Sequence, residues 1–263
     1  MTLSIATWNV NSIKARLPNV LEWLGEAKPD IACLQEIKCV DEAFPREEIE
    51  ALGYNVETVG QKSYNGVALL SRFAIEEVAQ RALPGDESDE QARYIEAVIS
   101  APNGPVRVAS IYLPNGNPAP GPKHDYKLAW MERLRAHAAG LLAYEEPVVL
   151  AGDYNIIPRD VDVHDPAAWE GDALIRPDSR DAFFALLWLG YTEAFQHCDG
   201  RADQYTFWDY QAGAWPKNHG IRIDHLLCSP QAADRLKGVE IHKDVRGREK
   251  ASDHVPVVGS FAL

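Results

Sequence analysis

The stretch PVVLAGDYN, residues 147–155, joins a run of apolar residues to an abrupt polar end. Its apolar half has the length and composition of a buried strand, and Asp153 and Asn155 follow directly after Gly152. Gly, Asp and Asn also suit a simple turn, so the stretch alone has two interpretations. It predicts either a strand that ends in a turn or a strand that carries two polar ligands to the edge of a sheet.

Polar side chains stand beside apolar, strand-like runs at several other places in the chain. They are Asn9, Glu36, Tyr112, Asp224 and the pair Asp253-His254. Each of these residues, taken alone, fits a turn or a cap better than a site. Turns do not require this composition at so many strand ends, however. We therefore expect the ends to converge on a pocket of carboxylates, carboxamides, a phenol and an imidazole.

Length and composition predict one compact domain. The chain has 263 residues, 46% of them hydrophobic, which is enough for a large core and predicts a single domain over residues 1–263. There is no run of eighteen apolar residues and no secretory signal pattern, so we expect a soluble monomer without a membrane partner. The four cysteines lack paired CxxC spacing, which favours reduced thiols and a cytoplasmic protein.

The charge balance argues against a polyanionic partner. Lys and Arg number 26 against 39 Asp and Glu, which gives a formal net charge of −13. Net charge is a statement about solubility, however, and does not describe one face of the molecule. An enzyme of this composition that acts on nucleic acid needs locally clustered basic residues, and metal ions that mask its acidic pocket.

Strand and helix patterns alternate along the chain and predict an α/β or α+β fold. Apolar residues at helical spacing predict helices around residues 17–24, 128–142 and 182–189, the first of them capped by Asn11 or Ser12. Apolar or alternating runs predict strands at residues 3–8, 31–35, 54–59, 67–71, 94–99, 106–112, 147–151, 223–228, 239–242 and 255–262. So many strands with so few long helices fit two packed sheets covered by helices better than one helix per strand.

Turn and loop signals complete the expected organisation. Asn65-Gly66 lies between two predicted strands and is a hairpin signal. Long irregular segments at residues 114–122, 158–177 and 209–220 follow candidate ligand positions. Loops of this length in a compact domain are usually functional or mobile.

The polar residues at the strand ends have the chemistry of a site for Mg²⁺ or Mn²⁺. Carboxylate and carboxamide oxygens are the ligands that these hard cations prefer, and zinc is disfavoured because His254 lacks thiolate or histidine companions. The metal-ligand candidates are Asn9, Glu36, Asp153, Asn155, Asp253 and His254.

His254 has a second interpretation as a cation. If Asp224 accepts a hydrogen bond from this histidine, it fixes the tautomer and favours the imidazolium, which then binds an anion such as phosphate. A serine nucleophile at Ser252 is the competing idea, but it lacks a GxSxG context. Neither GxxxxGK[ST] nor GxGxxG follows a strand, so phosphate must be held by side chains and metal.

Taken in order, these segments resemble a known family. TWNVN (7–11), LQE (34–36), YLPNG (112–116), GDYN (152–155), GIRID (220–224) and SDH (252–254) are similar to motifs of the exonuclease III family of apurinic/apyrimidinic endonucleases. Each motif is weak by itself, but the series runs through most of the chain.

The resemblance implies a fold and a reaction. The fold is a four-layer αββα sandwich of two packed mixed sheets flanked by helices, with the site at one edge of the sheets. The reaction is metal-dependent hydrolysis of DNA phosphodiesters. It includes 3′-5′ exonuclease activity on double-stranded DNA, incision 5′ to an abasic site and cleaning of 3′ ends. The implied partner is double-stranded DNA with abasic sites, nicks or blocked 3′ ends.

The resemblance also implies a role for each candidate. Glu36 matches the metal carboxylate, with Asn9 and Asp253 beside it, and Asp153 matches the general acid or base. Asn155 matches a transition-state stabiliser, Tyr112 an active-site phenol, and Asp224 with His254 an orienting pair. The catalytic candidates are therefore Tyr112, Asp153, Asn155, Asp224, Asp253 and His254.

Substrate recognition is expected from residues near these motifs. In the family, the matching segments surround a baseless deoxyribose that has left the helix, and an abasic nucleotide is easy to extrude because it neither stacks nor pairs. The substrate-binding candidates are Asn115, Arg93, Phe207, Trp208, Ile221 and Ile223. Ile221, Ile223 and Asn115 depart from better-known members, which leaves the balance between abasic incision, 3′-end cleaning and exonuclease activity open.

Two other functions are consistent with parts of the sequence. A relative in the wider superfamily could hydrolyse inositol phosphates or sphingolipids, but the segments around Tyr54, Phe207 and Asp224 favour the nuclease family. A non-catalytic DNA-binding module would be expected to have lost a ligand or a base. All of the catalytic candidates are present.

Overall fold

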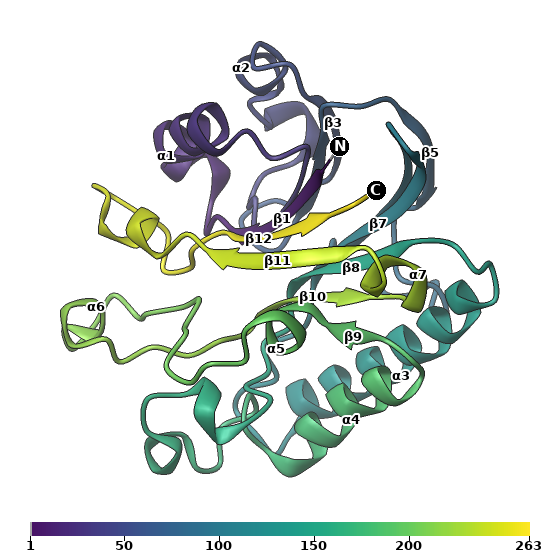
Figure 1. Ribbon diagram of the computed structural model, residues 1–263. Coiled ribbons are helices and arrows are strands. Elements are labelled where there is room, and N and C mark those ends of the chain that lie inside the picture. Colours follow the sequence, from purple (N-terminus) through teal and green to yellow (C-terminus); the bar gives the residue numbers. More distant parts are fainter. Residues whose placement is uncertain (1) are drawn as a thin grey trace.

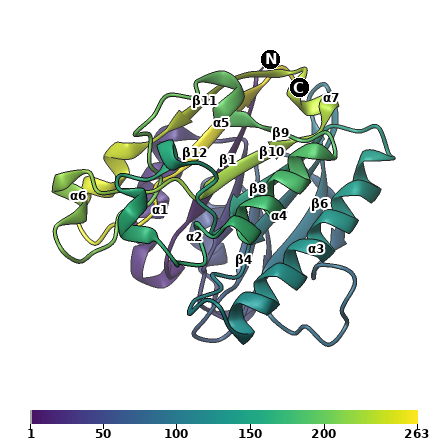
Figure 2. The same cartoon turned by 90° about the horizontal axis from the view of Figure 1, so that it is seen from below.

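The computed structural model describes residues 2–263 and arranges them in four layers (Figure 1). Two six-stranded sheets pack against one another in the middle. Helices α1 (Ile13–Ala27) and α2 (Arg46–Glu50) cover one outer face, and α3 (Pro122–Leu142) and α4 (Pro177–Trp188) cover the other. Figure 2 shows α3 and α4 side by side across their sheet. The predicted αββα sandwich is confirmed.

The first sheet places the amino-terminal strand at its centre. In spatial order its strands are β11 (Leu236–Ile241), β12 (Val257–Phe261), β1 (Leu3–Asn9), β2 (Ile31–Gln35), β4 (Val67–Ser71) and β3 (Asn55–Val59). β1 and β2 run parallel, and the other neighbours are antiparallel. Parallel strands end at the same edge of a sheet. Asn9, the last residue of β1, and Glu36, which directly follows β2, therefore lie at the same edge.

The second sheet brings three candidate residues next to one another. In spatial order its strands are β5 (Ile75–Gln80), β6 (Tyr94–Ala101), β7 (Gly104–Tyr112), β8 (Val148–Asp153), β10 (Asp224–Cys228) and β9 (Thr192–Glu193). β7 and β8 are parallel and pair Tyr112 with Asp153, whereas β8 and β10 are antiparallel and pair Asp153 with Asp224. One edge of the sheet therefore carries all three side chains.

Short elements fill the irregular segments. They are η1 (Asp41–Ala43), η2 (Asp160–Asp162), η3 (Pro166–Trp169), α5 (Ala194–Cys198), α6 (Ala214–Lys217), α7 (Pro230–Ala233) and η4 (Lys243–Gly247). The loop that carries α6 projects at the left of Figure 1, beyond the ends of the sheets. Among residues 2–263, no helix has the length and apolar character that crossing a membrane requires.

Apolar clusters fill the three spaces between the layers. Val149 of β8 packs between the two sheets, and its neighbour Leu150 packs toward α3 and α4. Successive side chains of a strand point to opposite faces, so β8 is buried on both. This burial explains why its apolar run in the sequence is unbroken.

The local signals in the sequence have mixed outcomes. The Ser12 hydroxyl accepts a hydrogen bond from the amide of Ala15 at 3.4 Å, so the predicted cap of α1 is confirmed. β3 and β4 form the predicted hairpin, but their loop extends from Gly60 to Gly66. Asn65 and Gly66 have positive φ angles of 50° and 86° and form the end of that longer loop. Their backbone groups are hydrogen-bonded to neighbouring loops.

Candidate active site

The ends of β1, β2, β7 and β8 and the beginning of β10 meet at one edge of the sandwich. The side chain of Asn9 joins the two sheets there. Its Nδ2 donates to Glu36 Oε1 at 2.8 Å and to Asp153 Oδ2 at 2.9 Å. Its Oδ1 accepts from the backbone N–H of Asn11 at 3.0 Å, which fixes the orientation of the amide. The predicted convergence therefore places a carboxylate from each sheet on the same amide group.

Glu36 is held as a carboxylate at the half-buried side of this group. Its backbone adopts a positive φ of 51°, and Lys38 Nζ lies 2.7 Å from its Oε2. Burial raises the pKa of Glu36, but Lys38 and the Asn9 hydrogen bond outweigh burial, so the pKa lies below its ordinary value. The outer oxygen of Glu36 thus already pairs with a cationic group.

Asp153 lies deeper, with only 1% of its surface exposed. The backbone N–H of Asn155 donates to its Oδ1 at 2.9 Å, and Asn9 occupies its Oδ2. Burial raises the pKa of Asp153 to about 7, and the charge of Asp224 adds to this, while His254 and the hydrogen bonds oppose it. A carboxyl group with this pKa can accept or release a proton near neutral pH.

His254 forms the predicted pair with Asp224. Its Nδ1 lies 2.9 Å from Asp224 Oδ2, which also accepts from Thr206 Oγ1 at 2.6 Å. Its Nε2 lies 3.8 Å from Asp153 Oδ2. Burial acts to lower the pKa of His254, but Asp224 and Asp153 raise it to about 10. The ring is therefore a cation at neutral pH, with Nε2–H directed toward the acid cluster.

Tyr112 contributes a protonated phenol. Burial raises its pKa well above the ordinary value, and the charges of Glu36 and Asp153 raise it further. The guanidinium of Arg93 lies 4.8 Å from the centre of the Tyr112 ring, and Arg93 Nη1 donates to the Tyr112 carbonyl at 3.3 Å. Arg93 thus lies directly beside the site.

Asn155 and Asn115 form a pair on neighbouring loops. Asn155 adopts a positive φ of 48°, its Nδ2 donates to the Leu113 carbonyl at 2.9 Å, and its Oδ1 accepts from Asn115 Nδ2 at 3.1 Å. One of its two side-chain N–H groups is thus already engaged. Asn115 is exposed, which leaves its outer edge open to a ligand.

Asp253 lies at the rim. Its Oδ1 accepts from Asn11 Nδ2 at 3.1 Å and from Ser252 Oγ at 3.3 Å. The Asn11 contact places it on the same side as Asn9 and Glu36, and its side chain is half-buried. Asp253 is therefore accessible to solvent and to a ligand, whereas Asp224 is buried.

The donor atoms of this edge suit a divalent cation. Ligand atoms of Asp153, Asp224 and His254 lie within 4.8 Å of one another, and Asn9 links Glu36 to Asp153. Asp224 Oδ1 is buried without a hydrogen-bond partner among residues 2–263. Carboxylate and carbonyl oxygens of this kind are preferred by Mg²⁺ and Mn²⁺.

Two of the predicted metal ligands, His254 and Asn155, have other partners in this structure. His254 Nδ1 lies 2.9 Å from Asp224 Oδ2, and the raised pKa of the ring favours the imidazolium, which has no free lone pair. The Asn155 carboxamide is turned toward Leu113 and Asn115. Both residues are better placed to contact a phosphate than a metal.

The predicted apolar wall needs a correction. Phe207 packs at 4.9 Å from the His254 ring and is half-exposed, but Ile221 and Ile223 are 1% and 3% exposed and form the support behind it. The prediction for Trp208 is wrong, because its indole is fully buried on the α1 side of the first sheet, against Trp215. Adjacent residues of an extended segment face opposite sides, so Phe207 at the site directs Trp208 into the core.

Some contributors were not predicted. Thr206 orients Asp224, and Lys127 contacts the Asn155 backbone from α3. No pattern in the sequence distinguishes Thr206 from the other residues of its irregular segment. Lys127 follows His124-Asp125-Tyr126, a polar run that is typical of an exposed helix face.

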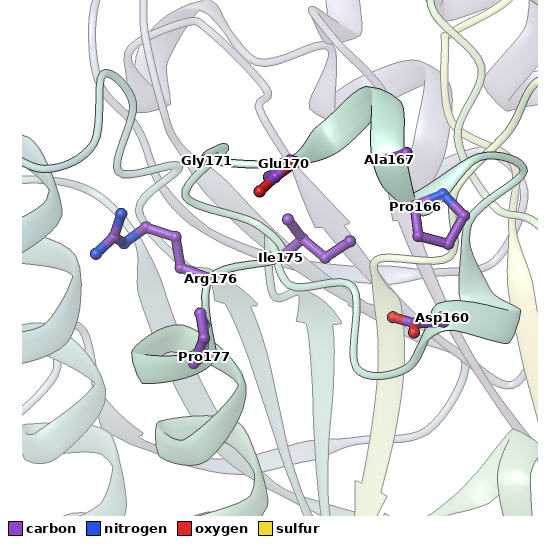
Figure 3. A pocket seen from close by; sticks show the side chains of 8 residues that line it. All are labelled: Asp160, Pro166, Ala167, Glu170, Gly171, Ile175, Arg176 and Pro177. Atoms are coloured by element: carbon purple, nitrogen blue, oxygen red, sulfur yellow. The ribbon is translucent and has the colours of Figure 1, made fainter.

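One surface pocket of about 460 Å³ lies apart from this edge. Figure 3 shows Ile175 in its middle, with Pro166 and Asp160 on one side and Arg176 pointing away. None of the predicted site residues lines it. The hollow in the irregular segment 158–177 is therefore separate from the acid cluster.

Known proteins resemble this chain over nearly its whole length. The profile of the Endonuclease/Exonuclease/phosphatase family matches residues 6–254. Exodeoxyribonuclease III of Haemophilus influenzae is 35% identical over 98% of this chain and all of its own length. The 3′ phosphatase NExo from Neisseria, solved with a product DNA hairpin, is 36% identical with a TM-score of 0.95, covering 99% of this chain and all of that one. An AP endonuclease from Archaeoglobus fulgidus is also 36% identical, with a TM-score of 0.93 and the same coverage.

Proposed function

This chain belongs to the endonuclease/exonuclease/phosphatase family, and within it to the exonuclease III family of AP endonucleases, and we propose that its acid cluster hydrolyses phosphodiesters of damaged double-stranded DNA. It is a DNA-repair nuclease and a metal-dependent hydrolase. The observation that carries the chemical proposal is the placement of Asp153, with its pKa of about 7, beside the imidazolium of His254.

Asp153 is proposed as the group that takes a proton from the attacking water. Its carboxylate lies at the edge where the strands end, and a pKa near 7 lets it accept a proton near neutral pH. Asn9 and the Asn155 amide fix both of its oxygens. The orientation of the base is therefore set before substrate arrives, which lowers the entropy that must be lost at the transition state.

Three groups are proposed to contact the phosphate. The Nε2–H of His254 supplies a positive charge that Asp224 maintains, and this charge stabilises the negative charge that develops on the phosphate oxygens. The Tyr112 phenol stays protonated and donates to a phosphate oxygen or to the leaving group. The free N–H of Asn155 is a neutral donor on the same side.

Glu36 is proposed as the main metal ligand, with Asp253 at the rim and Asn9 holding Glu36 in place. A bound Mg²⁺ or Mn²⁺ would withdraw charge from the phosphate and lower the pKa of a water molecule. Its positive charge would also offset the negative charge of the cluster toward DNA.

Basic and aromatic side chains beside the site are proposed to offset the net charge of −13 where DNA binds. Arg16 Nη2 donates to the Tyr210 hydroxyl at 2.8 Å, and the Arg246 guanidinium lies 5.0 Å from the Tyr210 ring. Asn11 connects this group to Asp253. We define Arg16, Tyr210 and Arg246 as the basic rim and propose that it contacts the DNA backbone, as Arg93 does on the Tyr112 side.

Phe207 is proposed to face the sugar of the target nucleotide. It is the accessible member of the apolar wall, backed by Ile221 and Ile223, and it touches His254. Abasic sites, nicks and blocked 3′ ends are the proposed substrates, and the abasic nucleotide is the easiest to extrude because it neither stacks nor pairs. We further propose that residues 1–263 act as one catalytic domain, as a monomer, on DNA in the cytoplasm.

The proposal is tested by offering purified protein four duplexes: intact, nicked, abasic and 3′-phosphate. Cleavage of the damaged duplexes with Mg²⁺ or Mn²⁺, lost on chelation, is expected. Inositol phosphates and sphingomyelin serve as comparison substrates, and Asp153→Asn controls for contaminating nuclease. Hydrolysis of the lipids alone, or DNA binding without incision under any metal, would overturn the assignment.

A further inference from the structure

Lys127 is a lysine on α3 with no exposed surface. Its Nζ donates to the backbone carbonyl of Asn155 at 2.6 Å and to that of Asn115 at 3.0 Å. These carbonyls lie on two loops, one leaving β7 and the other leaving β8. A single amine from a helix outside the sheets thus joins the two loops that carry candidate site residues.

The contacts of Asn155 lead from this amine to the proposed base. Its carbonyl accepts from Lys127, its own amide N–H donates to Asp153 Oδ1 at 2.9 Å, and its side chain pairs with Asn115 at 3.1 Å. The position of Asn155, and with it one hydrogen bond of Asp153, therefore depends on where the Lys127 amine lies.

The stem of Lys127 also fits the loop closely. Gly116 has a positive φ of 91°, and a Cβ at that position would lie 2.7 Å from Lys127 Cδ. Glycine permits both the left-handed backbone and the close approach. The loop after β7 is thus folded directly onto the lysine side chain.

Burial of an amine is unfavourable unless its N–H groups are bonded. Burial lowers the pKa of Lys127 to about 7, and the charge of Asp153 partly opposes this. An amine retains at least two N–H groups in either protonation state, and two carbonyls accept from it. The contact with both loops therefore does not require a particular charge.

We propose that Lys127 is a positioning residue, which sets the loop conformation of Asn115 and Asn155 and so aligns the site for phosphodiester hydrolysis. This inference rests on the proposed function of the site. It assigns to the buried face of α3 a part in turnover and not only in packing.

The test is a double-mutant cycle on an abasic duplex. Lys127→Met keeps the stem and removes the donors, and we expect kcat to fall roughly 10–100-fold with KM within about twofold, as small misplacements of reacting groups produce. In the Asn155→Ala background the same change is expected to lower kcat less than in wild type, because the Asn155 carboxamide that Lys127 places is gone while the backbone amide that bonds Asp153 remains. Lys237→Met, on the exposed edge strand β11, removes an equal charge and serves as the matched control.

A purely structural role predicts a different pattern. Lys127→Met would then lower the melting temperature while the folded enzyme keeps its kcat, or the losses in the double mutant would multiply, and either result overturns the inference. If Lys127→Met does not fold, Gly116→Ala displaces the stem while keeping the amine, and the same cycle is run with it.

Hydrogen exchange separates this inference from the proposed function. Faster amide exchange in residues 113–117 and 153–157 of Lys127→Met is expected whether or not the protein cleaves DNA. Unchanged exchange there contradicts the positioning role. A wild-type protein that cleaves none of the damaged duplexes contradicts the proposed function instead.

Discussion

Asp153 and His254 lie in the same buried space but lose their protons at different pH values. The pKa of Asp153 is about 7 and that of His254 about 10. The causes differ, because burial raises the pKa of Asp153, whereas the charges of Asp224 and Asp153 raise that of His254 against the effect of burial. A change in the charge of either residue is therefore expected to alter both the stability of the fold and the rate of turnover.

Asp153→Asn is expected to abolish turnover while DNA binding is retained, since the amide keeps the shape and loses the base. In metal-free protein the substitution is also expected to raise stability at pH 8. The folded pKa of about 7 lies above the ordinary aspartate pKa of 3.8, so ionisation of the carboxyl disfavours the folded state, increasingly from pH 3.8 up to pH 7. The gain is of order 2–4 kcal/mol. Urea unfolding at pH 8 and pH 4 in EDTA measures it.

The stability gain should be small near pH 4, where the folded carboxyl is protonated and the unfolded one, with its ordinary pKa of 3.8, is only about half ionised. Equal effects at both pH values would mean that Asp153 is not a perturbed acid. Wild-type turnover in Asp153→Asn would remove it from the acid/base role.

Asp224→Asn is expected to lower the pKa of His254 from about 10 toward or below neutrality, because burial then acts without its main opposing charge. In wild type the raised pKa stabilises the fold fully below about 6.5, and this stabilisation is lost as the pH rises through 10. The NMR titration of the His254 ring measures both pKa values. We expect kcat to fall when His254 loses its positive charge. An unchanged pKa of His254 would show that Asp224 does not maintain the imidazolium.

At this scale, the sequence allowed the acids to be predicted better than their supports. Glu36, Asp153 and Asp224 directly end or begin apolar runs, and strand ends that meet at one edge bring such residues together. Lys127 lies in a polar run of a helix, and only the packing of α3 on its sheet shows that it is buried. Trp208 was misassigned because the sequence does not show on which side of the chain each residue of an irregular segment faces.

Among the elements, β10 combines a catalytic candidate with a buried ion network. Arg222, 2% exposed, lies two positions before Asp224. Its Nε donates to Asp162 Oδ1 at 2.8 Å and its Nη1 to Glu193 Oε1 at 3.0 Å. It thus anchors the segment that contains η2, and also β9, to the strand that carries Asp224.

Arg222→Met is expected to destabilise the protein by about 3–5 kcal/mol, because it leaves Asp162 and Glu193 buried without their countercharge. Chemical denaturation at neutral pH measures the loss. Arg201→Met is the matched control, since Arg201 pairs with Asp199 on the surface and is expected to show no measurable change. A loss in Arg222→Met no larger than in the control would show that the network adds nothing to stability.

Elements whose pattern depends on burial were predicted well, and those defined by local partners were not. β8 is apolar throughout because both of its faces are covered, and α1 has its core residues at helical spacing. β9 has two residues and β5 is only half-buried, so neither has a clear apolar pattern. Asn65-Gly66 predicted the hairpin correctly but not its loop, because the longer loop is set by contacts with segments far away in the chain.

For the whole molecule, the metal requirement follows from the charge of the edge. Asn9 brings the Glu36 and Asp153 carboxylates together, and Asp224 and Asp253 lie close by. A DNA phosphate cannot approach so many acids without a countercharge. Chelation is therefore expected to abolish cleavage, and Glu36→Gln to raise the Mg²⁺ concentration needed for half-maximal rate. An unchanged metal titration in Glu36→Gln would place the metal elsewhere.

The distribution of charge, and not its sum, is expected to govern DNA binding. The net charge of −13 repels a polyanion at a distance, whereas the basic rim of Arg16, Tyr210 and Arg246 offers local contacts. Each arginine–phosphate contact releases a counterion, so binding of a 20-base-pair abasic duplex should weaken linearly on a logarithmic plot against salt.

Arg246→Gln is expected to lower the magnitude of that slope by about 1, and Arg16→Gln to do the same. Both variants should keep kcat, because neither residue contacts Asp153 or His254. Fluorescence anisotropy from low to physiological salt, with Arg201→Gln as the control, measures the slopes. Slopes equal to that of wild type would exclude the basic rim from the DNA interface. The contacts with the DNA backbone would then have to come from the Arg93 side of the site, and Arg93→Gln would lower the slope instead.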